Sequence, residues 1–232
     1  MPGISIRHVI GNFIFDKLLR PFRSLIRPWM YRRFNRDLKR HTNNFGMQTW
    51  VGHPLIQTPH DLWTIQETIS AVRPALLIET GTFKGGSSMF YAHLMDLLDY
   101  GRIITVDLTK KHDRSHPRVT YLLGDSVGDA VVDEMTKAVS EADGPIMVIL
   151  DSGHTAEHVS REMDIYGDFV TPGSYMLVQD GKYDSKGRPQ GPLKSIVEYL
   201  PDHPEFEVEH GKCNRFLITH HPLGWLRRRA TS

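Results

Sequence analysis

Residues 76–88, with the sequence LLIETGTFKGGSS, decide the fold. They begin with the apolar run Leu76, Leu77 and Ile78, pass through Glu79 into a glycine-rich segment, and lead into residues 87–98, for which we expect a helix. A buried strand, a tight turn and a helix N-terminus in succession leave a loop of free backbone N–H groups facing one pocket. Glycines let such a backbone approach a ligand closely. The stretch therefore predicts a ligand-binding loop at the end of a parallel strand.

The spacing within this loop indicates the kind of ligand. Glu79, Gly81 and Gly85 give Glu-x-Gly-x-x-x-Gly, which differs from the Gly-x-Gly-x-x-Gly of dinucleotide-binding loops. An acid two residues before the first glycine suits a cationic, hydroxyl-bearing cofactor better than a pyrophosphate. S-adenosylmethionine is the common cofactor of that description. An NAD-dependent oxidoreductase on the same sheet is the alternative, and the glycine spacing and Glu79 disfavour it.

Length and composition are those of an ordinary globular protein. The chain has 232 residues, of which 40% are hydrophobic and 24% charged, enough for one α/β domain with a short extension. The single cysteine, Cys213, excludes an internal disulfide framework and a cysteine-based zinc cluster. No apolar run approaches the roughly 18 residues that span a bilayer, and the N-terminus lacks the pattern of a signal peptide. We therefore expect a cytoplasmic protein.

The charge is distributed unevenly along the chain. Residues 1–40 hold ten Lys or Arg against two Asp, a net charge of +8, so the overall +1 leaves −7 on the rest. We therefore divide the chain into a basic amphipathic arm, residues 1–45, and a main domain, residues 46–232. An acidic domain is a poor nucleic-acid binder, so we expect no nucleic-acid partner.

The arm has two interpretations. Its apolar and basic residues interleave, and Pro21 and Pro28 divide it into short helical pieces. It either lies on anionic lipid at the inner face of the membrane, or it packs on the acidic domain or on a second subunit. We also expect the chain to form a homo-oligomer.

Strands and helices alternate through the main domain. We expect a loop over residues 41–60, then parallel strands that are apolar throughout and covered on both faces, and finally an antiparallel hairpin. The expected strands are residues 75–80, 102–108, 119–123, 146–151, 175–180, 205–209 and 215–219, and the expected helices begin at residues 61, 87, 128, 155 and 193. This pattern predicts an α/β fold with a doubly wound, mostly parallel, seven-stranded sheet. Ligands in such folds bind at the carboxyl ends of the strands.

Polar residues occur at the ends of these successive strands. Because acids are rarely buried without a partner, packing of the core does not account for this pattern, and we interpret it as a binding site. Asp107, 26 residues after Gly81, is placed to bind ribose hydroxyls, and the GDS segment 124–126 is placed to face an adenine edge. The candidate cofactor-binding residues are Glu79, Gly81, Thr82, Gly85, Gly86, Ser87, Asp107, Asp125 and Ser126.

The last two parallel strands end in LDSGH (150–154) and VQDGKYD (178–184). Asp151, Gln179 and Asp180 converge if these strands are neighbours, and oxygen ligands of this kind suit Mg²⁺ or another hard divalent cation. His154, three residues after Asp151, could accept a proton from a substrate hydroxyl whose pKa the metal lowers. We therefore expect His154 and Asp151 to be the catalytic residues.

The polar segment 181–192 is long for an α/β connection. We interpret it as a lid over the acceptor, with Lys182, Tyr183 and Arg188 as candidate substrate contacts. A plain surface loop is the alternative.

Several of these segments together resemble a known family. ETGTFKGGSS, LDSGHT, GSYMLVQD, ITHHPLGWLRR and the upstream WVGHPLIQTPHDLWTIQE are similar to the rhamnosyl O-methyltransferases, whose members are often labelled cephalosporin hydroxylases. The resemblance runs from about Trp50 to Arg228. It implies a class I methyltransferase fold over residues 46–232, S-adenosylmethionine as donor, a divalent metal that is usually Mg²⁺, and a sugar hydroxyl as acceptor.

The resemblance also implies roles for individual residues. Related macrolide sugar methyltransferases use an Asp-x-x-His segment and a Glu-Asp pair, which by position makes Asp151 and Asp180 metal ligands and His154 the general base. The family's glutamate falls on Gln179, which removes one negative charge, so we expect metal dependence to survive in weaker form.

The expected activity is thus methylation of a sugar hydroxyl, on a rhamnose-like residue of a glycan or glycolipid. Methylation of a phenolic or other small-molecule hydroxyl, or a non-catalytic role in glycan assembly, are the alternatives.

Overall fold

The computed structural model describes residues 46–182, 191–216 and 218–230, together with Trp29, Arg32, Arg33, Arg36 and Asp37. The chain divides into two compact units, residues 1–44 and residues 45–232. In the first unit, Arg33 Nε donates to Asp37 Oδ2 over 3.1 Å. The short helical pieces and the membrane contact expected of residues 1–45 otherwise lie outside the described residues. Among the described residues, no helix is both long enough and apolar enough to cross a membrane.

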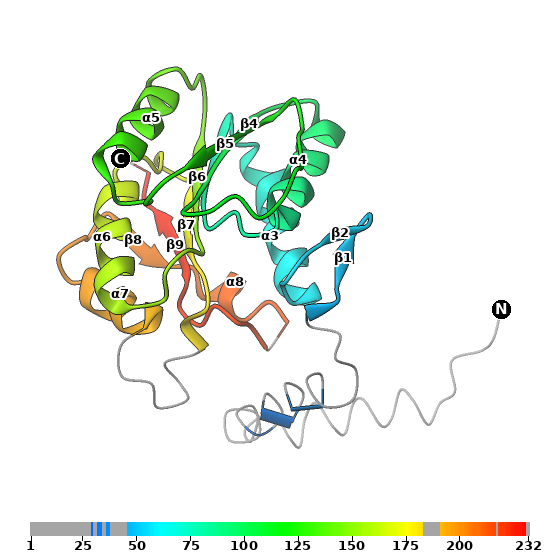
Figure 1. The fold of residues 1–232 in the computed structure, drawn as a ribbon. Helices are drawn as coiled ribbons and strands as arrows, with labels where there is room; N and C mark the ends of the chain where they lie inside the picture. Colours follow the sequence, from blue (N-terminus) through cyan, green and yellow to red (C-terminus); the bar gives the residue numbers. More distant parts are fainter. Residues whose placement is uncertain are drawn as a thin grey trace. The chain divides into compact units, whose positions relative to one another are not determined.

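A seven-stranded sheet runs through the second unit in the order β5-β4-β3-β6-β7-β9-β8 (Figure 1). The five strands β3 to β7 run parallel to their neighbours, whereas β9 pairs antiparallel with both β7 and β8. This confirms the expected mostly parallel sheet of seven strands. The strands are β3 (Leu76–Thr80), β4 (Arg102–Asp107), β5 (Val119–Leu123), β6 (Ile146–Leu150), β7 (Tyr175–Val178), β8 (Phe206–Val208) and β9 (Trp225–Arg228).

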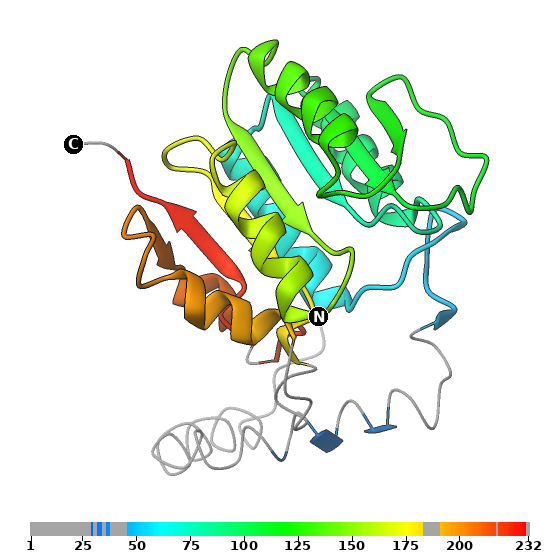
Figure 2. The same ribbon diagram turned by 60° about the vertical axis from the view of Figure 1, so that its left-hand side comes forward.

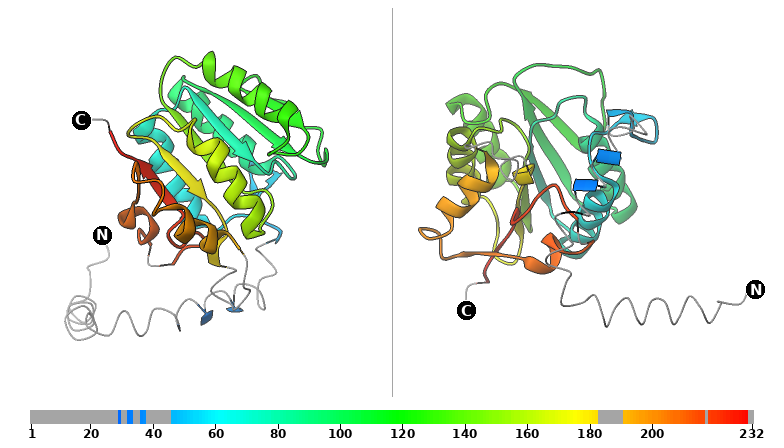
Figure 3. Two further views of the ribbon diagram at one scale, coloured as in Figure 1. Left: turned by 90° about the vertical axis from the view of Figure 1, so that its left-hand side faces the viewer. Right: turned by 90° about the horizontal axis from the view of Figure 1, so that it is seen from below.

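Helices cover both faces of the sheet, as a doubly wound fold requires. The helices are α3 (Pro59–Val72), α4 (Gly86–Leu98), α5 (Asp129–Ser140), α6 (Ala156–Gly167), α7 (Pro192–Tyr199) and the short α8 (His210–Cys213). Figure 1 shows α5, α6 and α7 on one side and α3 and α4 on the other. Figures 2 and 3 show the face that α5, α6 and α7 cover.

Each face has its own hydrophobic core because side chains alternate along a strand. In β3, Leu76 and Ile78 pack with the α5–α7 side, and Leu77 packs with the α3–α4 side. The same alternation in β6 places Val148 in the first core and Met147 in the second. A strand buried on both faces is a continuous apolar run, which is why the sequence pattern of β3 and β6 was informative.

Three expectations about elements are wrong in detail. The last strand is β9, not residues 215–219, so β8 and β9 are antiparallel partners separated by α8 and a loop rather than by a tight turn. The strand β5 lies at the sheet edge, and Leu123 is 66% exposed, so this strand is not covered on both faces. Residues 41–60 also contain a small antiparallel pair, β1 (Thr49–Trp50) and β2 (His53–Pro54).

The strand order positions the site. From β3 the chain builds outward to β4 and β5, then returns to the other side of β3 to form β6 and β7. The connections after β3 and β6 therefore leave the sheet in opposite directions and open a crevice at the carboxyl ends of these two neighbours.

Candidate active site

A cleft of about 640 Å³ lies in this crevice. Its lining residues follow β3, β4, β5, β6 and β7, with a further contribution from the segment between β2 and α3. From the predicted site it includes Gly81, Thr82, Gly86, Ser87, Asp107, Asp125, Ser126, Asp151, His154, Gln179 and Asp180. The structure thus brings most of the predicted site residues together around one space.

The loop after β3 needs glycine at its first position. Gly81 has φ +91°, a conformation that L side chains rarely adopt, and a Cβ there would collide with the carbonyl oxygen of Asp151. The glycine therefore lets the β3 and β6 connections touch, which puts the predicted cofactor loop directly beside Asp151.

Glu79 lies beneath this loop rather than in the cleft. It is 1% exposed, and its Oε2 accepts hydrogen bonds from Ser88 Oγ (2.6 Å) and Thr105 Oγ1 (2.7 Å). Burial raises the pKa of Glu79, although the hydrogen-bonded hydroxyls lower it. Since Ser88 is on α4 and Thr105 is on β4, this carboxyl group ties β3 to the two elements that flank the loop.

The loops after β4 and β5 carry two carboxylates held by backbone N–H groups, the half-buried Asp107 and the exposed Asp125. Asp107 Oδ2 accepts from the N–H of Phe83 (2.8 Å) and its Oδ1 from the N–H of Thr109 (3.1 Å). Asp125 Oδ1 accepts from the N–H of Val127 (3.1 Å). The orientation of both acids is therefore fixed at the cleft wall before any ligand arrives.

Asp151, His154 and Asp180 form the cluster that can hold a cation. One ligand atom from each of the three lies within 4.8 Å of the others, and His154 Nε2 is 3.6 Å from Asp180 Oδ2. Burial, followed by the nearby charges of Asp180 and Glu79, raises the pKa of Asp151 well above its usual range. A divalent cation would offset this repulsion, and a carboxylate–imidazole–carboxylate set has the donor chemistry for it.

Gln179 lines the cleft next to this cluster, but its amide oxygen is engaged. Gln179 is 3% exposed, and its Oε1 accepts a hydrogen bond from Gln57 Nε2 over 2.6 Å. The amide oxygen of Gln57, Oε1, accepts a hydrogen bond from the backbone N–H of Thr58 (3.0 Å), just before α3. The side chain of Gln179 thus connects β7 to the N-terminus of α3.

Of the three predicted substrate contacts, Lys182, Tyr183 and Arg188, only Lys182 is among the described residues. Lys182 is 4% exposed and does not line the cleft; its Nζ lies 3.7 Å from Asp180 Oδ1 and contacts His220 Nδ1. Tyr183 and Arg188 lie outside the described residues, as does most of the segment expected to form a lid.

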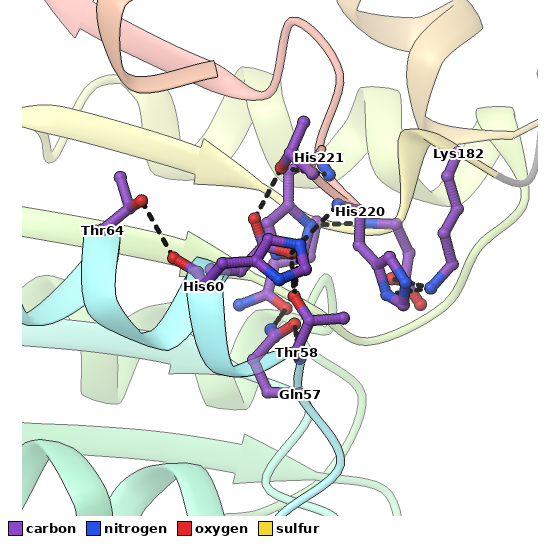
Figure 4. A network of polar contacts seen from close by, with 11 residues as sticks. Gln57, Thr58, His60, Thr64, Lys182, His220 and His221 are labelled. Carbon is purple, nitrogen blue, oxygen red and sulfur yellow. Dashed lines mark hydrogen bonds and ion pairs between the residues drawn. The ribbon is translucent and has the colours of Figure 1, made fainter. Parts of the chain in front are cut away.

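Asp61, near the start of α3, is the centre of a buried network that we did not predict (Figure 4). Its Oδ1 accepts from Thr219 Oγ1 (2.6 Å), and its Oδ2 accepts from the N–H of His220 (3.0 Å) and from Thr58 Oγ1. Although burial raises the pKa of Asp61, its interactions with His221, Thr219, Thr58 and the His220 N–H lower it below the usual value, so the carboxyl group is ionised. The PHD and THH segments appeared in the family resemblance, but nothing local indicated that they meet.

His221 connects this network to the cation cluster. The ring is fully buried; its Nδ1 accepts from the backbone N–H of Asp180 over 3.0 Å, and its Nε2 lies 3.8 Å from Asp61 Oδ2. Burial lowers the pKa of His221, although Asp61 and Asp180 raise it. A neutral ring that accepts at Nδ1 carries its proton on Nε2, toward the Asp61 carboxylate.

His158 also reaches the cleft, from the first turns of α6. Its Nε2 lies 3.1 Å from both Ser126 Oγ and Ser152 Oγ and 3.5 Å from Glu162 Oε1. Ser152 Oγ in turn donates to the same oxygen of the buried Glu162 over 2.6 Å. His158 therefore connects the loops after β5 and β6. Its position in the sequence, one turn after His154, does not predict this role.

The sheet order, the glycine loop after the first strand of the parallel set and the acids at the following strand ends together define a class I methyltransferase fold. The comparisons with known proteins give the family. A sequence model described as Rhamnosyl O-methyltransferase/CmcI matches residues 42–229, so the chain belongs to this family.

Individual relatives agree with this assignment. The chain is 26% identical to the rhamnosyl O-methyltransferase of Mycobacterium tuberculosis, covering 97% of this chain and 94% of the relative. It is 28% identical to that of Mycobacterium leprae, with 78% and 83% covered. Among solved structures, CmcI-D160 with Mg and S-adenosylmethionine superposes with a TM-score of 0.66 at 19% identity, over 81% of this chain and 78% of that one. The last comparison confirms the fold.

Proposed function

We propose that the cleft is the active site of an S-adenosylmethionine-dependent, divalent-cation-assisted O-methyltransferase that acts on a sugar hydroxyl. Family membership makes the chain a methyltransferase of the S-adenosylmethionine-dependent kind. The observation that carries the finer proposal is the Asp151, His154 and Asp180 cluster, which opens into the same cleft as the glycine loop.

The cofactor would be held along the β3, β4 and β5 side of the cleft. The backbone around Gly81 and Gly86 lets the ligand approach closely, Asp107 offers its carboxylate to ribose hydroxyls, and Asp125 and Ser126 face the base. Glu79 acts indirectly in this proposal, because its carboxyl group is buried beneath the loop and shapes it. When bound, S-adenosylmethionine supplies an activated methyl group on its sulfonium sulfur.

The cation would be held by Asp151 and Asp180, with His154 beside them. A bound Mg²⁺ supplies a positive charge that lowers the pKa of a hydroxyl next to it. The two carboxylates fit this charge because their mutual repulsion is otherwise offset only in part, by the Lys182 ammonium at 3.7 Å from Asp180. Gln179 contributes no charge, so the protein ligands carry fewer negative charges than a Glu-Asp pair would give.

His154 is the proposed general base. Its side chain is 42% exposed to the cleft, so a substrate hydroxyl can reach it, and Asp180 at 3.6 Å stabilises the imidazolium that forms when Nε2 accepts a proton. The protein's remaining contribution is to align the acceptor oxygen with the methyl group, and alignment of this kind lowers barriers by about 7–11 kcal/mol.

The named relatives support a sugar acceptor. The mycobacterial relatives are rhamnosyl O-methyltransferases, and we propose a rhamnose-like residue of a glycan or glycolipid as the acceptor here. The basic arm, residues 1–45, would then bring the methyltransferase domain, residues 46–232, to an acceptor at an anionic membrane surface. Assembly into a homo-oligomer is part of the same proposal.

The test is a methyl-transfer assay with labelled S-adenosylmethionine and a panel of acceptors. Rhamnose-terminated glycolipids and free glycans should gain one methyl group by mass spectrometry, and catechol-like phenols should not. Methylation of the phenols alone would contradict the sugar acceptor, and no transfer to either class in the presence of Mg²⁺ would contradict the enzymatic proposal.

A further inference from the structure

Asp180 has an unusual backbone conformation for a side chain that must be placed accurately. Its φ is +60°, in the left-handed region that is sparsely populated by residues other than glycine. Such a conformation persists only where the surrounding structure holds it, and residues of this kind cluster at functional sites.

The contact on its N–H comes from a histidine 41 residues later in the chain. His221 Nδ1 accepts the Asp180 N–H at 3.0 Å, and the His221 ring is fully buried, so no water competes for this hydrogen bond. An N–H can only donate, so the ring must accept at Nδ1 and carry its proton on Nε2. That proton points toward Asp61 Oδ2, 3.8 Å away.

The segment that carries His221 is itself fixed by Asp61. Thr219 Oγ1 donates to Asp61 Oδ1 (2.6 Å) and the His220 N–H donates to Asp61 Oδ2 (3.0 Å). The His221 N–H donates to Thr219 Oγ1 (3.0 Å). One carboxylate on α3 thus fixes the backbone that carries the His221 ring, and the Asp180 N–H donates to that ring. Figure 4 shows His220 and His221 close to the first turn of α3.

We infer that Asp61 and His221 are a positioning pair that holds Asp180 in its left-handed conformation and so aims its carboxylate at the cation. This inference rests on the proposed function, because it assumes that Asp180 is a cation ligand. His221 does not line the cleft; in this inference it acts through the Asp180 backbone. Partners behind a metal ligand typically change metal affinity by about 10–100-fold when they are removed.

The test compares two replacements of His221 in the full-length protein. His221→Leu fills the space but accepts no hydrogen bond, whereas His221→Asn can present its amide oxygen near the position of Nδ1. Mn²⁺ binding is measured by electron paramagnetic resonance, and the exchange rate of the Asp180 amide hydrogen is measured in the absence of any metal. His210→Leu, on the exposed first residue of α8, is the matched control for the same chemical change.

We expect His221→Leu to weaken Mn²⁺ binding about 10–100-fold and to speed Asp180 amide exchange, and His221→Asn to recover most of both. Asp61→Asn should weaken Mn²⁺ binding in the same direction, and His210→Leu should change neither quantity. S-adenosylmethionine affinity should stay within about twofold in every variant, since the predicted cofactor residues follow β3, β4 and β5, whereas Asp180 follows β7.

If the folded His221→Leu protein bound Mn²⁺ as tightly as the wild type, the inference would be overturned, but the proposed function would be unaffected. Equal losses in the Leu and Asn variants would also overturn it, because packing rather than the hydrogen bond would then be responsible. Failure of the wild-type protein to bind Mn²⁺ would overturn both the inference and the proposed cation site.

Discussion

His154 lines the cleft, and its Nε2 lies 3.6 Å from Asp180 Oδ2. We propose that this imidazole accepts the proton of the substrate hydroxyl. His154→Ala should lower kcat by roughly 10²–10⁴-fold, because general-base catalysis contributes about that much. The dissociation constant for S-adenosylmethionine, measured by calorimetry, should not change, because the predicted cofactor residues follow other strands. A collapse of cofactor affinity would instead mean that His154 is structural.

The same variant separates two roles for the imidazole. A base does not bind the cation, so the Mg²⁺ concentration for half-maximal residual activity should stay near that of the wild type. A large increase would make His154 a ligand, as its place within 4.8 Å of the two carboxylates also permits.

Gln179 stands where the resemblance to the family implies a glutamate ligand. Gln179→Glu should lower the Mg²⁺ concentration for half-maximal activity by roughly tenfold, because ligand charge is a main determinant of affinity for hard cations. The fold should tolerate the change, since Gln57 Nε2 can donate to a carboxylate as it does to the amide oxygen. An unchanged Mg²⁺ requirement would mean that residue 179 lies outside the cation's influence.

The glycine loop after β3 depends on a close approach of two backbones. Gly81→Ala should destabilise the protein by at least about 1–3 kcal/mol in urea unfolding, because it adds both a strained φ and a collision with the Asp151 carbonyl. Gly173→Ala is the matched control: its φ is +84°, but a Cβ there would meet nothing within 4 Å. Equal losses at the two positions would show that only the backbone conformation matters and that the β3 and β6 loops can separate freely.

Helix α6 connects the β5 and β6 loops through a titratable group. The hydrogen bond and charge of Glu162 raise the pKa of His158, although burial lowers it. A raised pKa in the folded state means that the stabilisation is complete below the unfolded value of about 6.5 and is lost as the pH rises through the folded pKa. The difference in Tm between wild type and His158→Gln should therefore be largest below about pH 6.5 and shrink in more alkaline buffer. A difference that stays constant from pH 5.5 to pH 9 would contradict this account.

Taken as a whole, the molecule has a charge of +8 in residues 1–40 and −7 in the remainder. Removal of residues 1–40 should reduce sedimentation with liposomes rich in anionic lipid and leave binding to neutral liposomes unchanged, because surface binding of basic segments is electrostatic. Methyl transfer to a water-soluble acceptor should persist, because the cleft is lined by residues of the second unit. Equal sedimentation with and without the arm would favour packing of the arm on protein instead.

Much of this architecture follows from the sequence alone. Strand and helix periodicity are properties of neighbouring residues, so the alternation of elements, the parallel sheet and the polar ends of β3, β4, β6 and β7 could be predicted. The need for glycine at position 81 could also be predicted, because the positive φ of a tight turn is a local requirement. The strand β9 was misplaced because short edge strands have weak patterns and take their place from pairing with distant neighbours.

Contacts between distant segments required the tertiary structure. Gln57 meets Gln179 across 122 residues and Asp61 meets Thr219 across 158, and neither pairing leaves a trace in local spacing. The burial of Glu79 and Lys182 was likewise decided by what packs over them: Glu79 has the hydroxyls of Ser88 and Thr105, and Lys182 has Asp180 and His220. The sequence determines which residues lie at the end of each strand. Only the tertiary structure determines which of these side chains line the cleft and which are buried beside it, because this depends on which distant groups satisfy their hydrogen bonds.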